Sequence, residues 1–169
     1  MTALTEREAE TELRLHAAIR PEPDAVLVWV PDGRHGRRTA VRSAEHLAVL
    51  ISALRADEFG IVERIDGRGP WGQTARVPGD DGDADSWIVE LSDGSIDDFA
   101  QRAIRGAESD YPDRSGRSGP YELEPTERFR SFAAAEVLWA WEHGTLLTGI
   151  TRTLKYLTYS ERRSAGFAD

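Results

Sequence analysis

Residues 25–54 decide the fold class, and they read AVLVWVPDGRHGRRTAVRSAEHLAVLISAL. The run at 25–30 is rich in valine and too apolar to alternate, which predicts a strand covered on both faces. Pro, Asp and Gly at 31–36 predict a turn, and residues 38–42 then alternate with period two. The stretch therefore begins with a predicted β-hairpin.

A helix follows this hairpin directly. Ser43 is a favoured N-cap residue, and apolar residues recur at helical spacing over 44–56. The predicted buried face consists of Leu47, Leu50, Ile51 and Leu54.

More strands are expected beyond this helix. Residues 59–65, 74–77 and 86–91 are strand candidates. The first two are separated by a glycine-rich loop at 66–72, and an acidic loop at 78–85 precedes the third.

Two further helices are predicted in the second half of the chain. Ser95 caps one that runs to about Gly106, with Ile96, Phe99, Ala100 and Ala103 on its buried face. A long exposed loop is expected at 109–120, and Gly144 is expected to end a helix over 129–143. Residues 146–159 suit either a helix or a strand, and we favour a short strand or an irregular segment.

Strands with helices packed against them, without strict β–α alternation, predict an α+β fold with a mostly antiparallel sheet. The 169 residues are expected to form one domain, 1–169. A capping box predicts a helix at about 6–19, which makes residues 1–22 a possible peripheral element. The tail at 160–169 is expected to fray.

Composition excludes several classes of protein. The chain is 40% apolar and 30% charged, and it has no cysteine, which removes disulfides, thiolate catalysis and zinc ribbons. No apolar run reaches the roughly 18–20 residues that span a bilayer, and no secretory signal is visible. We therefore expect a cytoplasmic protein without a membrane partner.

The formal net charge of −9 is concentrated in one segment. No basic residue lies between Arg76 and Arg102, whereas eight acids do: Asp80, Asp81, Asp83, Asp85, Glu90, Asp93, Asp97 and Asp98. Such a segment is either a solvated surface or a docking surface for a basic partner. Direct binding to nucleic acid is not expected, because the phosphates would repel the chain.

No motif for a metal, a cofactor or catalysis is complete. The loop at 66–72 lacks the lysine and hydroxyl residue of a phosphate loop. Asp81, Asp83 and Asp85 have calcium-loop spacing, but Ser86 and Ser92 stand where glycine and glutamate are needed. The histidines (His16, His35, His46 and His143) fall in separate elements. We expect no catalytic residue, metal or cofactor.

The predicted helix at 129–143 has two apolar faces. Ala134, Val137, Leu138 and Trp141 share one face, and Phe132 and Trp139 point nearly the opposite way. Either the helix is sandwiched between the sheet and another segment, for example the chain beyond Gly144, or these aromatics anchor a partner. Trp71 in the glycine-rich loop is a similar candidate.

Short patches resemble a family of immunity proteins. They are SAEHLAVLISAL at 43–54, WIVELSDG at 87–94 and WAWEHGTL at 139–146, in an element order that spans about residues 25–150. The resemblance implies an α+β domain, common in actinobacteria and encoded beside deaminase and nuclease toxins. The helix at 6–19, the insertion at 106–124 and the residues after Gly144 depart from the family, so no residue role is carried over.

The sequence therefore favours a non-catalytic, acidic binding protein that neutralises a basic partner, in the first place a toxin. The predicted partner-binding residues are Asp80, Asp81, Asp83, Asp85, Asp97 and Asp98, with Trp71 and Trp139 as anchors. Two alternatives stay open. One is an accessory or chaperone-like subunit, and the other is a small-molecule enzyme with a site near residues 109–120.

Overall fold

The computed structural model describes residues 27–31, 37–56, 58–79, 85–95, 98–116, 122–157, 161 and 163. The helix predicted at 6–19 and most of the tail from residue 160 lie outside the described residues. So do most of the turn at 31–36 and the centre of the acidic loop.

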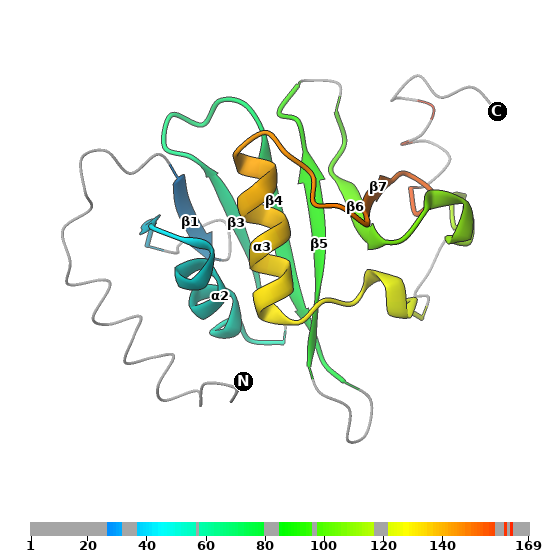
Figure 1. The fold of residues 1–169 in the computed structure, drawn as a ribbon, viewed down its shortest axis with the longest axis horizontal. Coiled ribbons are helices and arrows are strands. Elements are labelled where there is room, and N and C mark those ends of the chain that lie inside the picture. The colour runs from blue at the N-terminus through cyan, green and yellow to red at the C-terminus, as the bar shows by residue number, and fades with distance from the viewer. Residues whose placement is uncertain are drawn as a thin grey trace.

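The described chain forms one seven-stranded sheet in the order β2-β1-β3-β4-β5-β6-β7, and every neighbouring pair is antiparallel (Figure 1). The strands are β1 Leu27–Pro31, β2 Thr39–Val41, β3 Phe59–Arg64, β4 Trp71–Val77, β5 Ser86–Ser92, β6 Gln101–Arg105 and β7 Ile150–Thr153. The helices are α2 Ala44–Ser52 and α3 Ser131–Glu142, with short 3₁₀ turns η1 Glu108–Asp110 and η2 Pro125–Glu127. The predicted α+β fold and the hairpin of β1 and β2 are confirmed.

Helix α2 begins where its cap predicts. The backbone N–H of His46 donates to Ser43 Oγ at 3.1 Å, and Leu47, Leu50 and Ile51 are buried. The helix ends at Ser52 instead of residue 56. The chain turns there because the N–H groups of Ala53 and Leu54 bond three residues back, and Arg76 Nη1 donates to the carbonyl of Leu54 at 3.0 Å.

Helix α3 lies in the same layer as α2, and both cover one face of the sheet (Figure 1). It packs on β3, β4 and β5 and also on α2. Helix α2 therefore flanks α3 beside the sheet, and Phe132 and Trp139 are half-buried. Gly144, at φ 78°, follows the helix in the left-handed conformation that its predicted role requires.

The helix predicted from Ser95 to Gly106 is wrong. Residues 98–100 are irregular, and 101–105 form β6 between β5 and β7. Phe99 and Ala103 are four residues apart, which suits one face of a helix, but only Ala103 lies in β6. Pairing on both sides supplies the backbone hydrogen bonds, so tertiary context overrides the local pattern.

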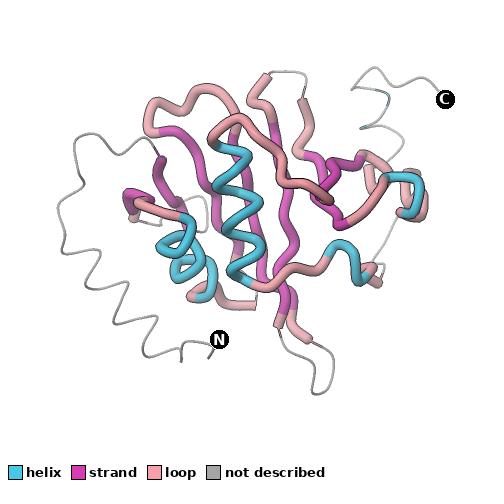
Figure 2. Tube along the Cα trace, in the orientation of Figure 1, coloured by secondary structure: helices cyan, strands magenta, loops and turns pink. Residues whose placement is uncertain are grey.

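The loop at 109–120 is also less exposed than predicted. Tyr111 and Arg114 are buried, at 2% and 8% exposure. Lys155 holds this segment in place because its Nζ donates to the carbonyls of Glu108 and Tyr111 at 2.6 and 2.9 Å. Figure 2 shows the connection from the end of α3 running across to β7, which confirms the short strand expected within 146–159.

Candidate functional site

Strands β5 and β6 separate soon after they pair. They are joined only at Glu90 with Arg102 and Leu91 with Gln101. At the other end of β5, Trp87 instead exchanges two backbone hydrogen bonds of 2.9 Å with Phe129, just before α3. The segment that precedes α3 is thus inserted where β6 would otherwise continue.

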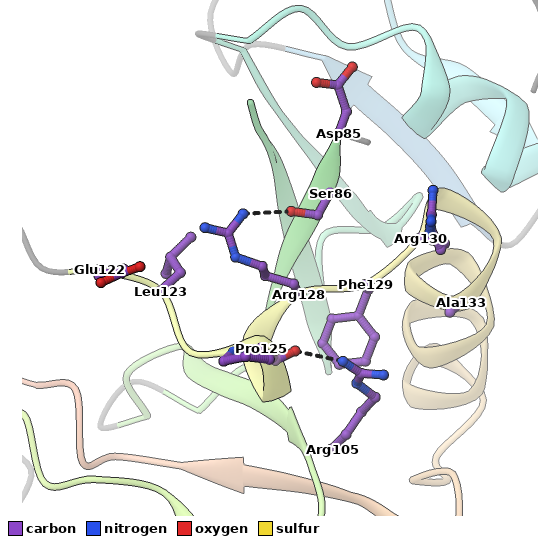
Figure 3. Close-up of a pocket in the computed structure, with 10 residues that line it drawn as sticks. All are labelled: Asp85, Ser86, Arg105, Glu122, Leu123, Pro125, Arg128, Phe129, Arg130 and Ala133. Carbon is purple, nitrogen blue, oxygen red and sulfur yellow. Dashed lines mark hydrogen bonds between the residues drawn. The ribbon is translucent and has the colours of Figure 1, made fainter. Parts of the chain in front are cut away.

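A pocket of about 540 Å³ opens beside this insertion (Figure 3). Arginines from two segments line it: Arg105 at the end of β6, and Arg128 and Arg130 before α3. Arg128 Nη1 donates to Ser86 Oγ at 3.2 Å, and Arg105 Nη2 donates to the carbonyl of Pro125 at 2.6 Å. We call this cavity the arginine pocket; Asp85, Glu122, Leu123, Phe129 and Ala133 complete its wall.

A buried polar row crosses the sheet next to the pocket. Arg102 donates to Glu127 Oε1 at 2.9 Å and to Glu90 Oε1 at 3.1 Å, and Glu90 also accepts from Gln73. The ring of Tyr156 lies 4.9 Å from the Arg102 guanidinium carbon. Because Arg102 and Glu127 are both buried, this row holds β4, β5, β6 and η2 together.

The other face of the sheet carries apolar residues interspersed with the polar Glu63, Gln73 and Glu90. Strand register places alternate residues of β1, β3, β4 and β5 on the face turned away from α2 and α3. Val30, Ile61, Trp71, Ala75, Val77 and Ile88 are half-buried there, and Phe59 is 36% exposed. Within the part of the chain that the structure describes, neither α2 nor α3 lies over these seven residues, which we call the outer sheet face.

Only part of the acidic segment belongs to the described residues. Asp80, Asp81, Asp83 and Asp97 lie outside the described residues. The described neighbours of these residues lie apart: Gly79 and Asp85 lie at one end of β5, and Ser95 and Asp98 lie beyond the other end. Those two ends are about 20 Å apart for a strand of this length.

The two described acids among the predicted partner-binding residues are already engaged. Asp85 pairs with Arg76, whose hydrogen bond lowers the pKa of the Asp85 carboxyl below its ordinary value. Asp98 is 10% exposed and accepts from Arg152 Nη2 at 2.9 Å and from the N–H of Asp93 at 2.6 Å.

The two tryptophans predicted as anchors lie on different sides of the sheet. Trp71 is the first residue of β4, not part of the loop, and belongs to the outer sheet face. Trp139 lies in α3, half-buried, with its ring centroid 4.4 Å from that of His143. One flat partner surface cannot contact both.

Sequence reasoning missed Glu142. This residue at the end of α3 is 5% exposed, and neither of its carboxylate oxygens has a hydrogen-bond partner. Burial raises its pKa to about 8; the charge of Arg64 opposes the rise and that of Glu63 adds to it. Its spacing of four residues from the buried Leu138 is the signal that could have identified it.

The described residues contain neither a cluster of metal ligands nor a membrane-spanning helix. Among the described residues, no group of three His, Asp or Glu side chains is placed to hold a metal ion. No described helix is both long enough and apolar enough to cross a bilayer.

In comparison with known proteins, no protein-family model, no curated protein and no solved structure matches the chain. The resemblance to immunity proteins therefore stays a prediction.

Proposed function

We propose that this protein is a binding protein that neutralises a basic protein partner, in the first place a toxin domain. The observation that carries the proposal is the outer sheet face, a group of apolar residues with Glu63, Gln73 and Glu90 among them, on a chain whose net charge is −9. The resemblance to immunity proteins agrees with this role.

The outer sheet face combines apolar and aromatic residues with polar neighbours on the same face, Glu63, Gln73 and Glu90. Protein interfaces have an apolar, aromatic centre surrounded by a polar rim. Ile61 and Ile88 occupy the middle of this face, Phe59 is partly exposed at one end, and Trp71 stands at the other. A half-buried tryptophan is a strong anchor once a partner covers it.

Charge selects the partner. Asp80, Asp81 and Asp83 follow Val77, the last residue of β4 on the outer sheet face, within a few positions. Asp85 and Asp98 are engaged within the protein, so we assign the steering of a basic partner to the first three acids. Domains that act on nucleic acid commonly carry a basic cleft, and an acidic protein can occupy it.

The test begins with capture of the partner from a lysate of the native host on the tagged protein, followed by mass spectrometry. Binding kinetics are then measured with the purified partner at low and high salt. We expect the captured partner to be basic. The triple variant that combines Asp80→Asn, Asp81→Asn and Asp83→Asn should associate with it more slowly, and its association rate should depend less on salt. A matched triple variant, Asp110→Asn with Glu122→Gln and Glu136→Gln, removes the same charge elsewhere and should leave association unchanged.

The apolar contact is tested separately. Ile61→Lys places a cation in the middle of the outer sheet face and should weaken the complex by at least about 30-fold. Val49→Lys, a half-buried position on α2, is the matched control and should bind normally. An acidic partner, or equal effects of Ile61→Lys and Val49→Lys, would refute the proposal. The partner's own activity then separates toxin neutralisation from an accessory-subunit role.

A further inference from the structure

We propose that the arginine pocket binds the phosphate group of a small organic phosphate monoester. The pocket borders the outer sheet face, because Ser86 in its wall lies opposite Val77 and on the same side of β5 as Ile88. Its ligand has the opposite charge to the partner proposed above.

The three arginines of the pocket form no ion pair within the described part of the chain, a property they share with exposed arginines outside the pocket such as Arg68. In the described part of the chain, Arg76, Arg102, Arg114 and Arg152 each form an ion pair with a carboxylate. Arg105, Arg128 and Arg130 form no ion pair with a carboxylate among the described residues. Arg105 and Arg128 donate to neutral oxygens instead. In a chain with excess acid, three cations without a carboxylate partner around one cavity leave a local site for an anion.

The beginning of α3 adds to this positive field. Arg130 is the N-cap residue, and Ala134 is the first residue whose N–H bonds back, to the carbonyl of Arg130 at 2.9 Å. The N–H groups before Ala134 have no acceptor within the helix, and no acid stands in the first turn. The helix dipole of these twelve residues therefore favours an anion on the same side as the arginines.

The acids of the pocket wall do not cancel these charges. Asp85 is paired with Arg76, and its carboxylate points away from the Arg128 guanidinium (Figure 3). Figure 3 shows Glu122 at the edge of the pocket, on the same side as Arg128, and the described residues include no ion pair between the two. Three guanidinium groups and a helix N-terminus suit the double charge of a phosphate better than the single charge of a carboxylate.

The pocket also has room and apolar surface for more than the phosphate. Its volume of about 540 Å³ falls within the roughly 300–1,000 Å³ of small-molecule sites. Leu123, Pro125, Phe129 and Ala133 contribute carbon surface to its wall. This composition indicates an organic group attached to the phosphate, and not the inorganic ion alone.

Phenyl phosphate is the probe, and isothermal titration calorimetry on the full chain is the measurement. We expect one site with a Kd of about 1 mM or below, and at least fivefold weaker binding of inorganic phosphate. Arg128→Gln and Arg130→Gln should each weaken phenyl phosphate about tenfold or more. Arg130 is exposed, so its substitution preserves the fold.

Arg68→Gln is the matched control, because it removes one exposed positive charge from a loop outside the pocket. Its binding should equal that of the unmodified protein. No heat at 10 mM of probe (about ten times the expected Kd), or equal weakening by Arg68→Gln and Arg130→Gln, would overturn the site. Equal affinity for inorganic and phenyl phosphate would overturn the organic part of the ligand.

Discussion

Glu142 is buried and has a strongly raised pKa, both of which are unusual for a glutamate. A carboxyl with 5% exposure and no hydrogen-bond partner is costly to ionise, and burial raises its pKa to about 8 from an ordinary value of 4.5. Its place at the C-terminal end of α3 adds to the cost, because the helix dipole is negative there. The residue therefore links stability to pH.

The sign of that link follows from the raised pKa. The folded state holds the Glu142 proton more tightly than the unfolded state, so its contribution is fully favourable below about pH 4.5 and is lost as pH rises to about 8. At pH 9 we expect the free energy of unfolding of Glu142→Gln, measured by denaturant titration, to exceed that of the unmodified protein by on the order of 3 kcal/mol. At pH 4.5 the two free energies of unfolding should be nearly equal. Glu136→Gln, exposed on the same helix, is the control. Equal stabilities of the Glu142 variant and the unmodified protein at pH 9 would contradict the burial of this carboxyl.

Gly60 is a second position where one residue decides the packing. A Cβ atom there would lie 2.1 Å from Trp29 Cη2 and Cζ2, and Trp29 is 1% exposed and cannot move aside. We expect Gly60→Ala to cost about 1–3 kcal/mol in urea unfolding. Trp29→Phe introduces a smaller ring, so the double variant should lose less than the two single losses together. Strict additivity would show that the ring is not the obstacle.

At the scale of elements, β6 depends on contacts from distant parts of the chain. It pairs with β5 at only two positions, and its buried Arg102 reaches Glu90 in β5 and Glu127 in η2. The pocket exists because β6 leaves β5 and the segment before α3 takes its place. The buried polar row is thus what sets the position of the pocket wall.

Breaking the row tests this dependence. Arg102→Met leaves the fully buried Glu127 without its cation, and we expect a loss of about 3–5 kcal/mol in chemical unfolding. Combining it with Glu127→Met should recover much of the loss, since both charges are then removed. Arg38→Met, which breaks an exposed pair with Glu63, should cost less than about 1 kcal/mol. A comparable loss in the two single variants would mean that the buried row has no special role.

At the scale of the whole molecule, one core joins both helices to the sheet. Residues from β1, β3, β5, α2 and α3 belong to it, and Ala103 of β6 extends it beyond the point where β5 and β6 part. The sheet then separates two surfaces: the helix layer on one side and the outer sheet face on the other (Figure 1). Of the described acids in the charged segment, Asp85 precedes β5, and Asp93 and Asp98 follow it.

A shared core predicts cooperative unfolding. We expect a single calorimetric transition whose calorimetric and van't Hoff enthalpies agree, as for a single domain. A separate early transition, or a calorimetric enthalpy well above the van't Hoff value, would show that β6 and β7 unfold independently of the core around α2 and α3.

The sequence by itself determined the features that short-range chemistry controls. Ser43 caps α2, Gly144 ends α3, and the residue pattern of β5 predicts its strand, because caps, turns and alternation act within a few residues. These features were enough to predict an antiparallel α+β fold.

Only the tertiary structure decided the rest. Whether residues 101–105 form a helix or a strand depends on β5 and β7, and the burial of Glu142 depends on how α3 packs on the sheet. The arginine pocket unites Arg105 with Arg128 and Arg130 across more than twenty positions of the sequence. Strand pairing and desolvation arise between segments far apart in the chain, so no local pattern contains them.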